Sequence, residues 1–197
     1  MTFPAMKPAL GAIAATFLLA GCVSIGGKAP DKMFTLTPAQ TAAVGSGASG
    51  EISSGIAVLE PGTSQRLDVT RVPVQTSEAT LAYLQYATWV EKPTKLFQRL
   101  VAETIRARGT RLVLDGGDAE YAARTQLNGN LIEMGYDAQT GSVTVTFDAM
   151  LSQTDGTVRT RRFSATESGI PAEADFVGPA LNRAANQVAV EVANWVN

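Results

Sequence analysis

The stretch that decides the fold is SVTVTFDAMLSQTDGTVRTRRFSAT, residues 142–166. Its first part, Ser142 to Leu151, alternates apolar and polar side chains, which is typical of a strand with one buried and one solvated face. Asp155-Gly156 then predicts a tight hairpin into a second strand from Val158 to Thr166, because these residue types tolerate the backbone conformations of such turns. The stretch therefore predicts an antiparallel sheet.

Two segments have the three- and four-residue apolar spacing of amphipathic helices. The first begins at Pro93 and ends at Gly109, with basic residues in its last turn. The second is C-terminal, and Pro179 either places its start near Gly178 or costs one early hydrogen bond. The expected fold class is α+β: a two-layer, mainly antiparallel sheet with two amphipathic helices packed on one face. The other face is expected to be open to water or to a partner.

Further extended segments, the longest of them over residues 122–134, are expected to complete the sheet. They cover residues 33–37, 55–60, 67–74, 80–86, 111–114 and 122–134. Residues 41–55 are rich in Ala, Gly and Ser, which predicts a loop before the second of these segments.

The composition excludes most catalytic chemistry. The 197-residue chain has no histidine and one cysteine, which excludes His-based triads, zinc sites with His or several thiolates, and an internal disulfide. Sixteen Lys and Arg against 18 Asp and Glu give no basic surplus that would attract nucleic acid. The carboxylates Asp115, Asp118 and Glu120 lack the spacing of a calcium loop. We expect no enzyme, no metal and no cofactor; a hydrolase would need a Ser/Lys or carboxylate pair converging in a pocket.

The N-terminus resembles the signal of bacterial lipoproteins. Lys7 precedes the apolar run Pro8 to Ala20, about 13 residues long, which is shorter than the roughly 20 residues of a membrane-spanning helix. The run leads into Ala20-Gly21-Cys22. The resemblance implies that residues 1–21 are a cleaved signal peptide and that Cys22 carries a covalent diacylglycerol and an N-acyl lipid. The alternative is that Cys22 is a small buried hydrophobe at the end of a retained helix.

The residue after the cysteine predicts the membrane. Val23 stands where an Asp would resemble the inner-membrane retention signal of Gram-negative lipoproteins, so we expect a lipid-anchored outer-membrane protein with its domain in the periplasm. Residues 22–32 are then a lipidated flexible spacer with Gly26-Gly27 and Pro30, and residues 33–197 a single α+β domain.

The segment Tyr83 to Phe97, YLQYATWVEKPTKLF, resembles the ABC-type transport auxiliary lipoproteins. Members have an extended aromatic segment, a Trp followed by an acidic residue and a Pro, and then an amphipathic helix; Trp89, Glu91 and Pro93 fit this pattern. The chain departs from the pattern at Thr94, where Leu is commoner. The resemblance implies an accessory lipoprotein that works with an MCE-domain protein and an ABC permease and ATPase. Together they would move phospholipid or other hydrophobic molecules across the periplasm. The alternative function is a structural or cell-wall-regulatory lipoprotein.

The aromatic side chains of this segment suggest where a partner binds. Tyr83, Tyr86 and Trp89 would form a docking platform, or would pack the sheet edge against the helix that begins at Pro93. A basic cluster, Arg159, Arg161 and Arg162, would meet anionic head groups or would be a solvated strand face. The sequence leaves both pairs of alternatives open.

Overall fold

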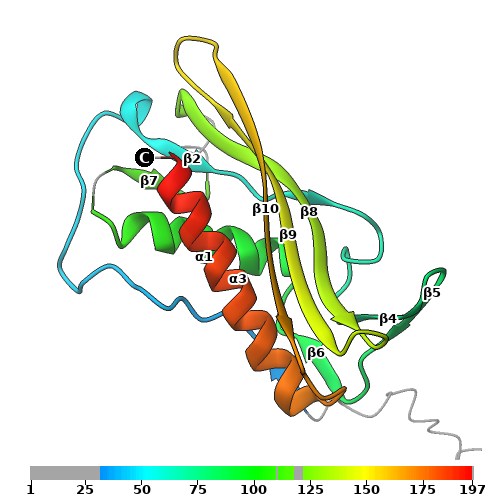
Figure 1. Ribbon diagram of the computed structural model, residues 1–197. Coiled ribbons are helices and arrows are strands. Elements are labelled where there is room, and N and C mark those ends of the chain that lie inside the picture. Colours follow the sequence, from blue (N-terminus) through cyan, green and yellow to red (C-terminus); the bar gives the residue numbers. More distant parts are fainter. Residues whose placement is uncertain (1–31, 110, 118–121, 197) are drawn as a thin grey trace, which may run out of the picture.

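The computed structural model describes residues 32–109, 111–117 and 122–196. In this part of the chain a curved sheet forms one layer, and the helices α1 (Pro93–Arg106) and α3 (Ala174–Val196) form the other (Figure 1). The α+β class, with both amphipathic helices on one face of a mostly antiparallel sheet, is confirmed. The expected signal peptide and Cys22 lie outside the described residues.

Three long antiparallel strands form one side of the sheet. They are β8 (Thr125–Asp137), β9 (Ser142–Ser152) and, at the edge of the sheet, β10 (Val158–Ser168). The register between β9 and β10 is continuous, so the predicted hairpin is confirmed. Gly156 has φ of 84° in its turn, a conformation that glycine adopts without steric cost.

The approach of β8 to β9 depends on a second glycine. Gly129 has φ of 149°, and a Cβ atom built on it would lie 2.0 Å from the carbonyl oxygen of Asp148. Close by, the register of β8 shifts between Leu131 and Glu133, which is a bulge. Bulges increase strand twist and bend, so this region contributes to the curvature of the sheet.

Short strands pair along the other edge of β8. In chain order β2 (Ile56–Val58), β3 (Gly62–Thr63) and β4 (Pro73–Ser77) each pair with β8 in parallel. The strand β5 (Thr80–Tyr83) pairs antiparallel with β4, and β7 (Val113–Leu114) pairs parallel with β2. One long strand therefore organises most of the N-terminal half of the domain.

A separate two-stranded sheet lies beside the start of α3. The strands β1 (Lys32–Phe34) and β6 (Ala87–Trp89) pair in parallel, and a short 3-10 turn, η1 (Ile52–Ser54), interrupts the loop that follows β1. Thus residues at the beginning of the described chain pack against a segment more than 50 positions further along it.

The expected strand over residues 67–74 is wrong for most of its length. Residues 67–71 form turns and bends, and β4 begins only at Pro73. The amides of Leu67 and Asp68 both bind the carbonyl oxygen of Ser64, while Leu67 and Val72 are fully buried. The apolar alternation therefore came from a turn whose side chains point into the core, not from a strand.

The helices confirm the predicted apolar faces. Pro93 is the first residue of α1, where its missing N–H has no cost. Of the two alternatives for the C-terminal helix the second holds: α3 begins at Ala174, before Gly178, and the amides of Phe176 and Val177 bind the carbonyl oxygen of Glu173. Pro179 therefore lies inside the helix and costs one helical hydrogen bond.

Aromatic pairs join the two layers. Phe97 of α1 contacts Phe147 of β9 edge to face, with ring centroids 5.2 Å apart. Phe163 of β10 and Trp195 of α3 make the same kind of contact at 5.6 Å. The core thus lies between the helices and the concave arrangement of long strands in Figure 1.

Candidate functional site

Trp89, around which the family resemblance is most specific, belongs to the core. Its side chain is 1% exposed and meets the ring of Phe34 edge to face at 5.6 Å. Phe34 of β1 packs against it, so of the two alternatives that the sequence left open for Trp89, its burial favours packing over a docking anchor. An indole enclosed in this way cannot contact a partner without local unfolding.

The acidic and proline positions of the same motif fix the start of α1. Glu91 accepts a 2.7 Å hydrogen bond from Arg99, and Lys95 lies 3.5 Å from its second carboxylate oxygen. The hydrogen bond from Arg99 lowers the pKa of Glu91. Pro93 then begins the helix. Trp89, Glu91 and Pro93 together hold the junction between β6 and α1, which is a structural role.

The two tyrosines of the segment have different environments. Tyr83 is half-buried at the end of β5, with the guanidinium carbon of Arg71 3.8 Å from its ring centroid. Tyr86 is 63% exposed and has φ of 59°, in the left-handed region that bulky residues rarely adopt. Of the three expected partner-binding aromatics, only Tyr86 presents most of its side chain to solvent.

A groove of about 510 Å³ opens beside Tyr86. Its walls come from the β5–β6 connection, β8, the start of α3 and the first described residue, and they include Lys32, Val74, Tyr83, Leu84, Tyr136 and Asp175. Tyr136 donates a hydrogen bond to the carbonyl oxygen of Ile170 at 2.8 Å, which holds this wall in place. The groove lies where the chain enters the domain.

The face of the sheet that the helices leave uncovered forms a larger, more polar hollow of about 920 Å³. Arg162 of β10 spans it to Asp148 of β9 with two hydrogen bonds of 2.5 and 2.6 Å. Arg162 lowers the pKa of Asp148, and the carboxylate raises the pKa of Arg162. The hollow is completed by Asn128, Asn130, Met150 and Thr160. This is the open face expected from the alternation in β9.

The predicted basic cluster is divided between different contacts. Arg159 lies over the ring of Trp195 at 4.9 Å and donates to its carbonyl oxygen at 3.1 Å. Arg161 lies 5.0 Å from the ring centroid of Phe163, whereas Arg162 pairs with Asp148 as described above. The three guanidinium groups therefore do not form one cationic surface.

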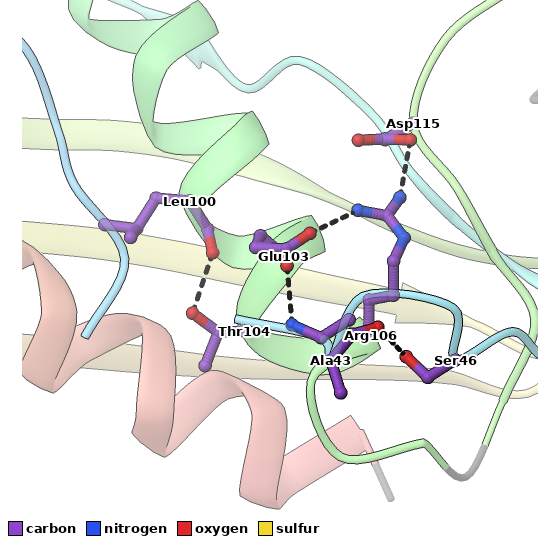
Figure 2. Close-up of polar contacts among 8 residues, drawn as sticks. Ala43, Ser46, Leu100, Glu103, Thr104, Arg106 and Asp115 are labelled. Atoms are coloured by element: carbon purple, nitrogen blue, oxygen red, sulfur yellow. Dashed lines mark hydrogen bonds and ion pairs between the residues drawn. The ribbon is translucent and has the colours of Figure 1, made fainter. Parts of the chain in front are cut away.

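Figure 2 shows a polar cluster that fastens the Ala- and Gly-rich loop to α1. Glu103 accepts a 2.8 Å hydrogen bond from the amide of Ala42, and Arg106 bridges Glu103 and Asp115 at 2.7 and 2.8 Å. Burial raises the pKa of Glu103, but the Ala42 amide and Arg106 outweigh it and leave this pKa lowered. The cluster has a structural role. Because Asp115 is paired with Arg106, it is not a candidate metal ligand.

Metal-ligand groups were sought among the described residues, and reactive side chains in the lining of the large hollow. They hold no group of three or more His, Cys, Asp or Glu side chains that would bind a metal ion; Asp118 and Glu120 lie outside them. The lining of the large hollow offers one carboxylate, already paired with Arg162, and neither serine nor lysine. In the same part of the chain, no helix is long and apolar enough to cross a membrane.

Sequence reasoning missed the polar residues of β8 that line the hollow. Asn128 and Asn130 belong to a predicted strand, and their position opposite the buried Leu127 and Leu131 follows from strand alternation. The alternation in the sequence could therefore have identified these two side chains. The contact between Arg71 and Tyr83 was not predictable in this way, because it depends on the turn that brings two separate segments together.

The comparisons with known proteins agree with the fold and with the motif. A family model described as ABC-type transport auxiliary lipoprotein component matches residues 34–193. This match confirms the resemblance found around Trp89, Glu91 and Pro93. No curated protein matches the chain.

Two crystal structures have a similar fold. One, of a protein from Xanthomonas campestris, is 18% identical, covers 85% of this chain and 92% of its own, and has a TM-score of 0.65. The other, of an uncharacterised protein, is 13% identical, covers 85% of this chain and 99% of its own, and has a TM-score of 0.64. At these identities the two structures show the fold alone.

Proposed function

We propose, from the premise that this chain belongs to the ABC-type transport auxiliary lipoprotein family, that it is the outer-membrane-anchored accessory component of an ABC/MCE-type transport system. The family match over residues 34–193 carries this proposal. The cargo would be phospholipid or another hydrophobic compound moving between the two membranes. The MCE-domain protein and the associated permease and ATPase are the partners.

The arrangement of the domain supports a binding role rather than turnover. The family is one of transport auxiliary lipoproteins and not a known enzyme family. The large hollow contains a charge-paired Asp148 and Arg162 with amide and hydroxyl side chains around them, which suits recognition of another polar surface. A non-catalytic protein that binds a partner needs a surface of this kind and no reacting group.

Of the two surfaces expected to meet a partner, the open face of the sheet is the better candidate for the MCE-domain protein. Trp89 is enclosed, and Tyr83 is covered in part by Arg71, which leaves Tyr86 as the exposed aromatic of the other surface. The open face instead offers a rigid floor, because two long antiparallel ladders join β8, β9 and β10. Rigid surfaces lose little conformational entropy on binding.

The anchor in this proposal is Cys22, with a diacylglycerol thioether and an N-acyl chain, and Val23 directs the protein to the outer membrane. Several acyl chains bind a bilayer far more firmly than one, since each buried CH₂ contributes about 0.8 kcal/mol. Intact-mass measurement tests the anchor: the wild-type chain should begin at Cys22 with added acyl mass, and Cys22→Ser should remain unprocessed. A wild-type chain without acyl mass would contradict the anchor.

Co-purification from membranes tests the function. The full chain, isolated with gentle detergent after sucrose-gradient separation, should sediment with outer-membrane markers and retain an MCE-domain protein identified by mass spectrometry. A sample of Cys22→Ser prepared in the same way controls for partner protein that binds the chain only after the cells are lysed. Enrichment of cell-wall synthesis proteins, with no MCE-domain protein or ABC subunit, would favour the structural alternative instead.

A further inference from the structure

Three large apolar side chains are exposed at the end of the domain where the described chain begins. Met33 and Tyr86 are each 63% exposed, and Phe176 is 49% exposed. Single apolar side chains are common on protein surfaces and need no explanation. Three that gather at one end indicate an interaction surface.

Lys32 joins the three segments that carry these side chains. Its amide donates a 3.0 Å hydrogen bond to the carbonyl oxygen of Tyr86, and its ammonium group forms an ion pair with Asp175. Met33 follows Lys32 in sequence, and Phe176 follows Asp175. Tyr86 therefore contacts Lys32 directly, Met33 is its neighbour in sequence, and Phe176 is the neighbour of its ion-pair partner. The three residues lie near one another at this end of the domain. The three come from β1, the β5–β6 connection and the first turn of α3.

The backbone of Tyr86 suggests that its outward ring has a use. A φ of 59° is ordinary for glycine or asparagine but costs free energy for a bulky aromatic residue. The groove of about 510 Å³ begins beside this ring, with Val74 and Leu84 in its wall. This end of the domain thus combines projecting and recessed apolar surface.

The short chain before Lys32 keeps this end of the domain close to the membrane that would hold Cys22. Lys32 lies ten positions after Cys22, and a fully extended chain advances at most about 3.5 Å per position, so the reach is at most about 35 Å. We propose that Met33, Tyr86 and Phe176, which we call the seating surface, rest the domain on the phospholipid bilayer that holds Cys22. This proposal depends on the lipidation of Cys22 that is part of the proposed function.

The side chains suit this occupant. Tyrosine places its ring at the level of lipid head groups while its hydroxyl stays hydrated, and Met33 and Phe176 are apolar throughout. The tether holds the surface near the bilayer at a high effective concentration, so a small patch is sufficient. The head-group zone also accommodates the ion pair between Lys32 and Asp175.

The seating surface would fix the orientation of the domain. The start of α3 and strand β6 lie at the opposite end from the β9–β10 hairpin in Figure 1. With the first end on the bilayer, the long strands point away from the membrane, and the hairpin that contains Gly156 is remote from the lipid. The open sheet face is then accessible to a partner from the periplasm.

The test uses single fluorescent labels on the full lipidated chain. Cys22 is the chain's one cysteine and its sulfur is blocked by lipid, so a bimane label reacts only with an introduced thiol. The labelled variants are Met33→Cys, Tyr86→Cys and Phe176→Cys, with Val158→Cys as the matched control. Val158 is also apolar and 55% exposed, but it lies at the hairpin end. Each is placed in phosphatidylethanolamine and phosphatidylglycerol vesicles with and without brominated acyl chains.

The expected result is a large loss of fluorescence on brominated lipid at positions 33, 86 and 176, and little loss at 158. Met33→Ser combined with Phe176→Ser should abolish the loss at position 86 without releasing the chain from the vesicles. Equal signals at 86 and 158, or no quenching at the three positions in a chain whose acyl mass is verified, would overturn the seating surface while leaving the anchor intact. A chain without acyl mass would overturn the anchor itself, and the seating surface with it.

Discussion

Replacing Trp89 by alanine tests whether this residue of the family motif stabilises the fold or binds a partner. The indole is 1% exposed and packs on Phe34 at 5.6 Å, so its removal leaves a cavity beneath β1 and β6. Truncation of a buried Trp or Phe to Ala costs about 3–5 kcal/mol. In a chain of this length each kcal/mol lowers the unfolding midpoint by about 2–4 °C, so we expect a decrease of about 6–20 °C in Trp89→Ala.

The matched control for this prediction is Tyr86→Asn in the same segment. Tyr86 is mostly exposed, and asparagine tolerates its positive φ, so the midpoint should change little. Both midpoints are measured by circular dichroism on the full chain, with partner binding determined in parallel on samples below the transition. An unchanged midpoint for Trp89→Ala together with lost partner binding would refute the core placement of Trp89.

Two further predictions concern the sheet and the loop that packs on α1. Gly129→Ala should destabilise the domain, by about 1–3 kcal/mol or more in denaturant titration, because its Cβ would lie 2.0 Å from the Asp148 carbonyl oxygen; Gly156→Ala, with open space at its Cβ, should cost less. Because the folded-state pKa of Glu103 lies below its ordinary value near 4.5, its contribution to stability is present above that value and is lost as the pH falls through the folded pKa. Glu103→Gln should therefore make stability fall less steeply with acid. In the wild type, the protection factor of the Ala42 amide against hydrogen exchange should decrease as this contribution is lost. A variant whose stability falls as steeply as that of the wild type would contradict this assignment.

Long periodic segments were predictable from the sequence because many residues repeat one pattern. Strand β9 gave eleven positions of alternation, and α1 gave fourteen positions of helical spacing. Strands β2 and β7 lie within the segments expected at 55–60 and 111–114, but their parallel pairing was not predictable, because parallel partners are distant in sequence. Strand β3 was missed, because its two residues do not establish a period.

The candidate surfaces were only partly predictable for a related reason. Alternation in β9 predicted an open face, but the charge pair between Asp148 and Arg162 depends on the register of the hairpin. The aromatic run Tyr83, Tyr86 and Trp89 does not by itself distinguish burial from exposure. Trp89 is buried because β1, from a distant part of the chain, pairs with β6 and covers it.

The most direct test of the account is binding between the full lipidated chain in vesicles and the purified MCE-domain protein, measured by co-flotation over a range of partner concentrations. Thr160→Trp fills the open hollow from an exposed position, and Gln187→Trp makes the same change on the exposed side of α3. We predict saturable binding by the wild type and by Gln187→Trp, and binding weakened about tenfold or more by Thr160→Trp, as blocking a central contact region can cost more than about 1.4 kcal/mol. No binding by the wild type would contradict the transport assignment, and equal binding by all three would contradict the open face as the docking surface.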